Sequence, residues 1–196
     1  EHKAEVVYEK DDLIVHKYDA SLYKNKEYVQ NLCLLARNFI EHKTVVWNND
    51  RSNDPEINYV YYVLSKRTEF GLRLVGYFSA PCVLEENHHI LNCIMILPPY
   101  QGHGHSQLLI ALAYAEALKV QRCGTPERPF SPGGQRAFEN YWNRVISREI
   151  ARVKYDDGLL SALHMPTISS MCVATGMTVG DVMETLVRLG KVDSKV

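Results

Sequence analysis

The stretch LPPYQGHGHSQLLIALAYAEAL, from Leu97 to Leu118, decides the fold of this chain. The apolar run that leads into it begins at His89 and predicts a strand buried on both faces. Two prolines end this strand, because proline has no N–H to donate to a neighbouring strand. From Ser106 to Val120 the alanine and leucine content predicts a helix, with Ser106 as its N-cap. A strand, a glycine loop and a helix therefore follow one another.

Such a junction points unpaired backbone N–H groups and the positive end of a helix at one spot, which suits a phosphate or pyrophosphate. The loop lacks the Lys and Ser/Thr of a P-loop, and Gly102 and Gly104 lack the third glycine of a Rossmann fingerprint. On spacing alone, a structural glycine turn is the commoner interpretation. His103 and His105 come with no obvious third ligand, so we expect no metal.

Composition narrows the class of protein. With 196 residues, 46% of them hydrophobic and 23% charged, the chain is long enough for one globular domain with a sizeable core. No apolar run approaches the roughly 20 residues that span a bilayer, so no membrane partner is expected. The formal net charge of -1 does not suggest a broad nucleic-acid surface. Five cysteines form neither a disulfide framework nor a CxxC pattern, which favours a reducing intracellular compartment.

The remaining elements follow from apolar periodicity and from breaker residues. We expect a helix over residues 27–41 and a short strand over 44–47. Two further strands, over 59–64 and 72–79, are separated by a short polar segment that indicates an antiparallel hairpin. After a rigid loop over 126–134, a helix is expected over 138–154. Two short helices follow, broken at Gly176, and Thr178 with Asp181 resembles a capping signal for the second.

Several segments, taken together and in this order, resemble the MYST family of lysine acetyltransferases. The most specific are NLCLLA, HKT, LVGYFS, LPPYQ and GTPERP, and ISSMCVATGMTVGDVMETL resembles the C-terminal helical region of that family. Any one of them alone would be weak. The resemblance runs from roughly Val7 to Leu189 and covers nearly the whole chain.

This resemblance implies an α+β fold: a GNAT-like acetyl-CoA-binding core with a central, mostly antiparallel sheet flanked by helices. Residues 1–160 are expected to form this core, and residues 161–196 a small helix-turn-helix-like part of the same domain. The family's zinc finger has no counterpart before Val7, and its last strand has none after the C-terminal helices; these either lie outside this chain or are lacking.

The implied function is that of a histone lysine N-acetyltransferase with acetyl-CoA as cosubstrate. Histone tails, subunits of a chromatin-modifying complex and a nuclear location are the expected context, without sequence-specific nucleic-acid binding. Two alternatives remain open. The substrate could be a non-histone lysine or another amine, or the chain could be a catalytically weak module that binds CoA or chromatin partners.

The resemblance also implies roles for single residues. A lysine amine, with a pKa of about 10.4, has to lose a proton before it attacks a thioester. Glu127, otherwise readable as a solvated loop glutamate, matches the base of the family's G-[ST]-P-E-[KR]-P motif. Cys93 matches the active-site cysteine, whose alternative role is simple core packing. Lys43 matches the family's autoacetylated lysine, or else is an exposed lysine at a helix end.

The expected acetyl-CoA contacts lie on the strand, in the loop and beyond it. They are Ile94, Ile96, Gln101, Gly102, His103, Gly104, His105, Ser106, Gln107, Ser131 and Asn140. The family loop is typically Q-R-R-G-Y-G-K, so this chain has lost both arginines and the lysine. Histidines are mostly neutral at pH 7, which predicts weaker CoA binding that strengthens as they are protonated below neutral pH.

Overall fold

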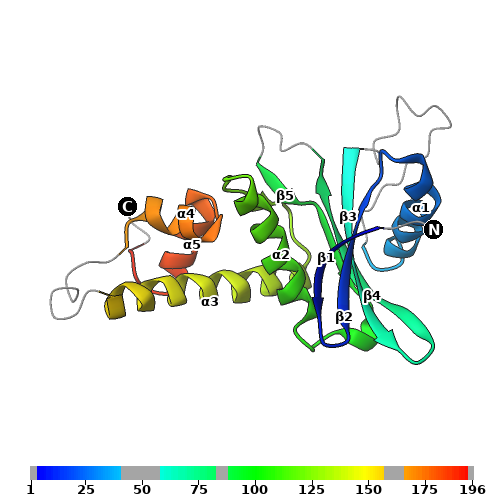
Figure 1. Cartoon of the computed structure of the whole chain (residues 1–196). Helices are drawn as coiled ribbons and strands as arrows, with labels where there is room; N and C mark the ends of the chain where they lie inside the picture. Colours follow the sequence, from blue (N-terminus) through cyan, green and yellow to red (C-terminus); the bar gives the residue numbers. More distant parts are fainter. Residues whose placement is uncertain (1–3, 41–57, 83–87, 157–165, 194–196) are drawn as a thin grey trace. The chain divides into compact units, whose positions relative to one another are not determined.

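The computed structural model describes residues 4–40, 58–82, 88–156 and 166–193 (Figure 1). The elements in chain order are β1 (Glu5–Lys10), β2 (Leu13–Asp19), η1 (Tyr23–Asn25), α1 (Lys26–Ala36), β3 (Tyr59–Thr68), β4 (Gly71–Pro81), β5 (His89–Leu91), β6 (Cys93–Ile96), η4 (Pro98–Tyr100), α2 (His105–Lys119), β7 (Thr125–Pro126), α3 (Pro132–Asp156), α4 (Ile168–Thr175) and α5 (Val179–Arg188). Antiparallel strands and helices are mixed, so the predicted α+β class is confirmed.

The chain forms two compact units, Glu1–Leu109 and Ile110–Val196, and the boundary between them falls within α2. The predicted division at residue 160 lies within 157–165, outside the described residues, and stays a prediction. The strand expected over 44–47 and Lys43 also lie outside them. No helix in the described part of the chain is both long and apolar enough to cross a membrane.

The first unit is built on a five-stranded antiparallel sheet in the order β1-β2-β3-β4-β6. The predicted hairpin is confirmed as β3 and β4, and both strands are longer than expected, pairing from Tyr59 with Pro81 to Thr68 with Gly71. Gly71 accommodates the turn with a φ of 99°, which glycine adopts without strain. Lys66 on β3 forms an ion pair at 3.1 Å with Asp12, which lies in the turn between β1 and β2.

Helix α1 covers one face of this sheet (Figure 1). Its apolar face packs onto side chains of β3, β4 and β6 in a cluster of Ala20, Val29, Leu32, Cys33, Ala36, Tyr61, Val63, Tyr77 and Met95. The helix ends at Ala36, not near residue 41 as predicted. The amide of Asn38 donates to the carbonyl oxygens of Leu34 and Leu35, at 3.4 and 3.1 Å, and so competes with further helical turns.

The strand predicted over 89–97 is interrupted. It forms β5 and β6, separated at Asn92, whose N–H donates to the carbonyl oxygen of Ser79 at 2.8 Å. The prediction of burial on both faces is also wrong for β6, in which only Met95 is buried. β6 is the last strand of the sheet, so its side chains have a neighbouring strand on one side within the described sheet.

The second unit is helical. α3 packs against α4 and α5, and the predicted break between the last two helices is confirmed at Gly176, which has a φ of 73° (Figure 1). α3 begins at Pro132, inside the segment predicted to be a rigid loop. Proline is favourable at the first position of a helix, and Ser131 supplies the cap by accepting the N–H of Gly134 at 3.1 Å.

Candidate functional site

The edge strand β6 lies unusually close to β4. A Cβ added at Gly76 would come within 2.2 Å of the carbonyl oxygen of Met95 and 2.7 Å of the Ile96 side chain, so only glycine fits. Immediately before Gly76, at Val75, β4 carries a bulge in its pairing with β3, and the carbonyl oxygen of Val75 accepts the N–H of Leu97 at 2.9 Å. Close approach and bulge together hold the end of β6 in place.

Two of the predicted acetyl-CoA contacts, Ile94 and Ile96, are half-buried on this strand. Cys93, at its start, is also half-buried and lies opposite Ser79 of β4 in the register. All three lie on the edge strand of the sheet. The sequence therefore placed these residues on the right strand, although it overestimated their burial.

The glycine loop leaves β6 through a short 3-10 turn, η4. Gln101 is tied back to the strand, since its side-chain amide donates to the carbonyl oxygen of Ile96 at 2.9 Å. Gly102 and Gly104 have φ values of 78° and 81°, in the region that favours glycine. A Cβ at either position would meet no atom within 4 Å, so the space beside both glycines is open.

Helix α2 begins directly after this loop, at His105. The N–H of Leu108 donates to the carbonyl oxygen of Gly104 at 3.2 Å, so the helical hydrogen bonds start from the loop's last glycine. Ser106 therefore lies within the first turn and is not the N-cap. The first turn of a helix attracts anions, and here that turn adjoins two glycines with open space beside them.

The loop histidines interact with each other. The rings of His103 and His105 stack at 6.0 Å, and His103 Nδ1 lies 2.8 Å from the carbonyl oxygen of Gln101. Burial lowers the pKa of His105 below its ordinary value, and His103 and then Lys66 lower it further, against a smaller opposing effect of Asp12. His105 is therefore neutral at pH 7 in the free protein.

Lys66 was missed as a candidate from the sequence. It stands on β3, far from the loop in the chain, and nothing in its local sequence marks it. Its ammonium nevertheless contributes to lowering the pKa of His105, and it also forms the ion pair with Asp12. A cation on another strand thus acts near a loop, residues 101–107, that contains no Lys or Arg.

The other predicted residues lie in the second unit. Glu127 follows β7 and is exposed. Ser131 caps α3, and Asn140 lies exposed on the same helix. The Gly134 N–H that Ser131 binds lies in the first turn of α3, and a Cβ at Gly134 would approach the Ser131 hydroxyl to 3.3 Å. Ser131 therefore has a structural partner within its own unit.

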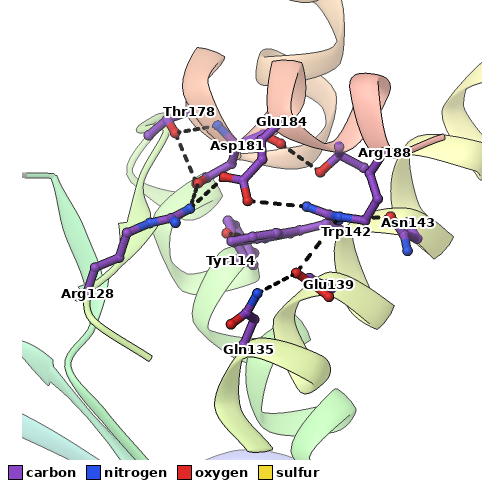
Figure 2. A network of polar contacts seen from close by, with 11 residues as sticks. Tyr114, Arg128, Gln135, Glu139, Trp142, Asn143, Thr178, Asp181, Glu184 and Arg188 are labelled. Atoms are coloured by element: carbon purple, nitrogen blue, oxygen red, sulfur yellow. Dashed lines mark hydrogen bonds and ion pairs between the residues drawn. The ribbon is translucent and has the colours of Figure 1, made fainter. Parts of the chain in front are cut away.

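Next to Glu127, Arg128 enters a network of polar contacts (Figure 2). Its Nη2 donates to Oδ1 of Asp181 at 3.2 Å and to Oε2 of Glu184 at 2.9 Å, both on α5. Burial by itself would lower the pKa of Arg128, but the two carboxylates outweigh it and raise that pKa. The guanidinium also lies over the rings of Phe130 and Trp142, at 4.8 and 5.8 Å.

In the described part of the chain, no group of three or more His, Cys, Asp or Glu side chains is placed to hold a metal ion. The fold and the junction define the class of protein: a GNAT-like α+β core whose glycine loop joins an edge strand to the start of a helix. This is the architecture of the MYST acetyltransferase core.

Comparisons with known proteins agree. The model of the MOZ/SAS family matches residues 1–195. The chain is 36% identical over 148 residues to the histone acetyltransferase Tip60 homolog of Caenorhabditis elegans, covering 76% of this chain and 30% of that protein. It is 37% identical over 163 residues to a putative MYST-like histone acetyltransferase 1 of Oryza sativa, covering 83% and 32%. Histone acetyltransferase KAT6B of Mus musculus is 33% identical over 192 residues, covering 98% and 9%.

This chain belongs to the MOZ/SAS family. The resemblance to MYST acetyltransferases is thereby confirmed over most of its length. The chain spans about a third or less of the length of these curated relatives.

Proposed function

We propose that this chain is the catalytic core of an acetyl-CoA-dependent lysine acetyltransferase that acts on histone tails. The observation that carries the proposal is the junction of β6, two glycines with positive φ and the start of α2, in a chain of the MOZ/SAS family. The names of the relatives describe histone acetyltransferases, which supports the same activity here.

The residues of the junction fit an acetyl-CoA molecule. The loop over 101–107 would hold the pyrophosphate through its backbone N–H groups, because Gly102 and Gly104 leave open space beside it. Ile94 and Ile96, half-buried on the edge strand, would line the pantetheine arm. Ser131 and Asn140 would complete the contacts from α3. No metal is part of this proposal.

In the proposed reaction the lysine amine first gives a proton to the carboxylate of Glu127. Its nitrogen then attacks the thioester carbonyl carbon of acetyl-CoA, forming the amide N–C bond. The C–S bond breaks with its electron pair on sulfur, and CoA leaves as a thiol because the thiolate takes up the second proton, which the attacking nitrogen loses as the amide forms. Glu127 is an exposed residue, and a base that acts on a protein substrate has to lie at the surface.

Cys93 lines the site in this proposal, and the amine attacks acetyl-CoA directly in a ternary complex. The alternative is a ping-pong route, in which the Cys93 thiolate accepts the acetyl group first. A single-turnover experiment with labelled acetyl-CoA and no peptide separates the two. Acetyl bound to Cys93 at a rate that matches turnover would establish the ping-pong route.

The biological setting is proposed from the family. We place the protein in the nucleus, with chromatin regulation as its role and histone tails and subunits of a chromatin-modifying complex as partners. Lys43 is the proposed site of autoacetylation, which mass spectrometry of the purified chain would detect. The second candidate function is a catalytically weak CoA- or chromatin-binding module. It is favoured by the loop over 101–107, which has histidines and no Lys or Arg to bind the phosphates of CoA.

Acetyl transfer to a panel of histone-tail peptides tests the proposal. The parent chain should transfer acetyl to at least one peptide, and Glu127→Gln should lower kcat by about 100-fold or more, the usual contribution of a general base. Cys93→Ala should reduce it far less. Transfer to no peptide, together with measurable CoA binding, would favour the binding module. Full activity of Glu127→Gln would remove Glu127 as the base.

A further inference from the structure

We infer that Arg128 is a positioning residue, whose ion pairs with α5 hold the Glu127 segment in place for proton transfer. This inference rests on the proposed function, in which Glu127 is the base. It adds a role for the C-terminal helices, because Asp181 and Glu184 of α5 both bind the guanidinium of Arg128 (Figure 2). We call these two ion pairs the anchor.

The anchor depends on a single nitrogen atom. Nη2 of Arg128 donates to both Asp181 and Glu184, so one position of the guanidinium satisfies two carboxylates. Asp181 is 3% exposed, so its carboxylate depends on its protein partners, while the side chain of Arg128 itself is about half exposed. The aromatic rings of Phe130 and Trp142 confine the same guanidinium from another direction. Arg128 is therefore held by charge and by stacking.

The carboxylates of α5 are themselves fixed. Thr178 caps α5 by accepting the N–H of Asp181 at 3.3 Å, and its hydroxyl donates to Oδ2 of the same aspartate at 3.0 Å. Glu184 is also paired with Arg188 at 3.5 Å. Arg188 in turn donates to Oδ1 of Asn143 on α3 at 3.0 Å, which joins the two helices (Figure 2).

One peptide unit separates Arg128 from Glu127. While the guanidinium is bound to α5, the backbone at position 127 cannot shift far, although the Glu127 side chain is exposed. Proton transfer depends on such placement, and a displacement of about 1 Å can lower a rate by about 100-fold. The long-range ion pairs thus fix the backbone next to an exposed loop residue.

The test is steady-state kinetics of the whole chain, with the Kd of CoA and the melting temperature measured for every variant. Arg128→Gln should lower kcat by about 10- to 100-fold, with KM for acetyl-CoA within about twofold. Arg128→Lys should recover part of the lost kcat, because its ammonium keeps a positive charge facing both carboxylates, although it ends one bond short of Nη2 and loses the stacked guanidinium plane. Glu184→Gln, on the half-exposed side of the anchor, should lower kcat by about threefold.

A double-mutant cycle separates positioning from a general loss of structure. In the Glu127→Gln background, adding Arg128→Gln should change the residual rate by less than about twofold, because Arg128 acts through Glu127. Arg144→Gln is the matched control: Arg144 stacks on Tyr141 at 5.7 Å, and its loss should leave kcat within about twofold.

The outcomes distinguish this inference from the proposed function. A parent chain that transfers no acetyl group overturns both. Activity in the parent that Glu127→Gln does not reduce overturns the base and, with it, the role of Arg128. If Glu127→Gln is impaired while Arg128→Gln is fully active, only the positioning role is overturned. The positioning role is also overturned if Arg128→Gln and Arg128→Lys are equally impaired, or if the effects of Arg128→Gln and Glu127→Gln on kcat multiply in the cycle. If Arg128→Gln does not fold, the kinetics of Glu184→Gln and Arg128→Lys test the positioning role instead.

Discussion

Gly76 on β4 lies so close to Met95 on β6 that a Cβ at position 76 would come within 2.2 Å of the Met95 carbonyl oxygen. The atom it would meet is backbone, which cannot rotate away as a side chain can. Gly76 therefore determines how closely the last strand of the sheet packs, immediately before the glycine loop.

We expect Gly76→Ala to push β6 away from β4 and to lower the free energy of unfolding by about 1–3 kcal/mol. The affinity for CoA should fall with it, because Ile94 and Ile96 lie on the displaced strand. Urea denaturation and calorimetric titration measure the two effects. Gly133→Ala is the control: a Cβ there meets nothing within 4 Å, and alanine in this helical turn should stabilise the protein slightly. Unchanged stability of Gly76→Ala would contradict the close approach.

Gly104→Ala should weaken CoA binding. Its φ of 81° is unfavourable for alanine, at a cost of about 1–3 kcal/mol, while open space excludes a clash. Strain in the loop should move the N–H groups at the start of α2. Gly190→Ala is a matched control, since Gly190 has a φ of 63° and equally open surroundings. Both variants should lose stability, but only Gly104→Ala should lose CoA affinity. Equal CoA affinity in the two variants would refute the proposal that the glycine loop holds the pyrophosphate.

A buried hydrogen bond in the second unit should contribute measurably to stability. Trp142 donates from Nε1 to the hydroxyl of Tyr114 at 2.8 Å, and both side chains are almost fully buried. Tyr114→Phe leaves the indole N–H without this acceptor, which should lower the free energy of unfolding by about 1–3 kcal/mol. Adding Trp142→Phe should cost less than the sum of the single changes. Strict additivity in urea denaturation would mean that the bond contributes little.

CoA binding should strengthen on acidification. Protonated histidine attracts phosphate, and burial together with His103 and Lys66 lowers the pKa of His105. The group therefore gains its proton only below its ordinary pKa of about 6.5, so most of the gain should appear below that pH. A phosphate group of CoA also titrates, with a pKa of about 6. The informative quantity is therefore the difference in CoA affinity, at each pH, between the parent and a His103→Gln, His105→Gln double variant. Parallel pH profiles for parent and variant would refute a role for the histidines.

Much of the first unit, and one helix cap in the second, could be predicted from local sequence. The β3–β4 hairpin, the glycine junction and the cap at Thr178 follow from residues within a few positions of each other, and the structure confirms all three. Strands β1 and β2 were not predicted, because the outer strand β1 has no buried side chain and hence little apolar alternation. The start of α3 was misjudged since Ser131 and Pro132 resemble a loop as much as a helix cap.

The candidate site shows the same division. The sequence by itself determined the order of strand, glycine loop and helix, the family, and the residues proposed for catalysis, because turn chemistry and motif spacing are local properties. Three features were decided by tertiary structure. Only glycine fits at position 76, because β6 lies so close; Lys66 lowers the pKa of His105; and Asp181 and Glu184 bind Arg128. Each of these joins residues far apart in the chain, and such contacts form only once packing brings their strands and helices together.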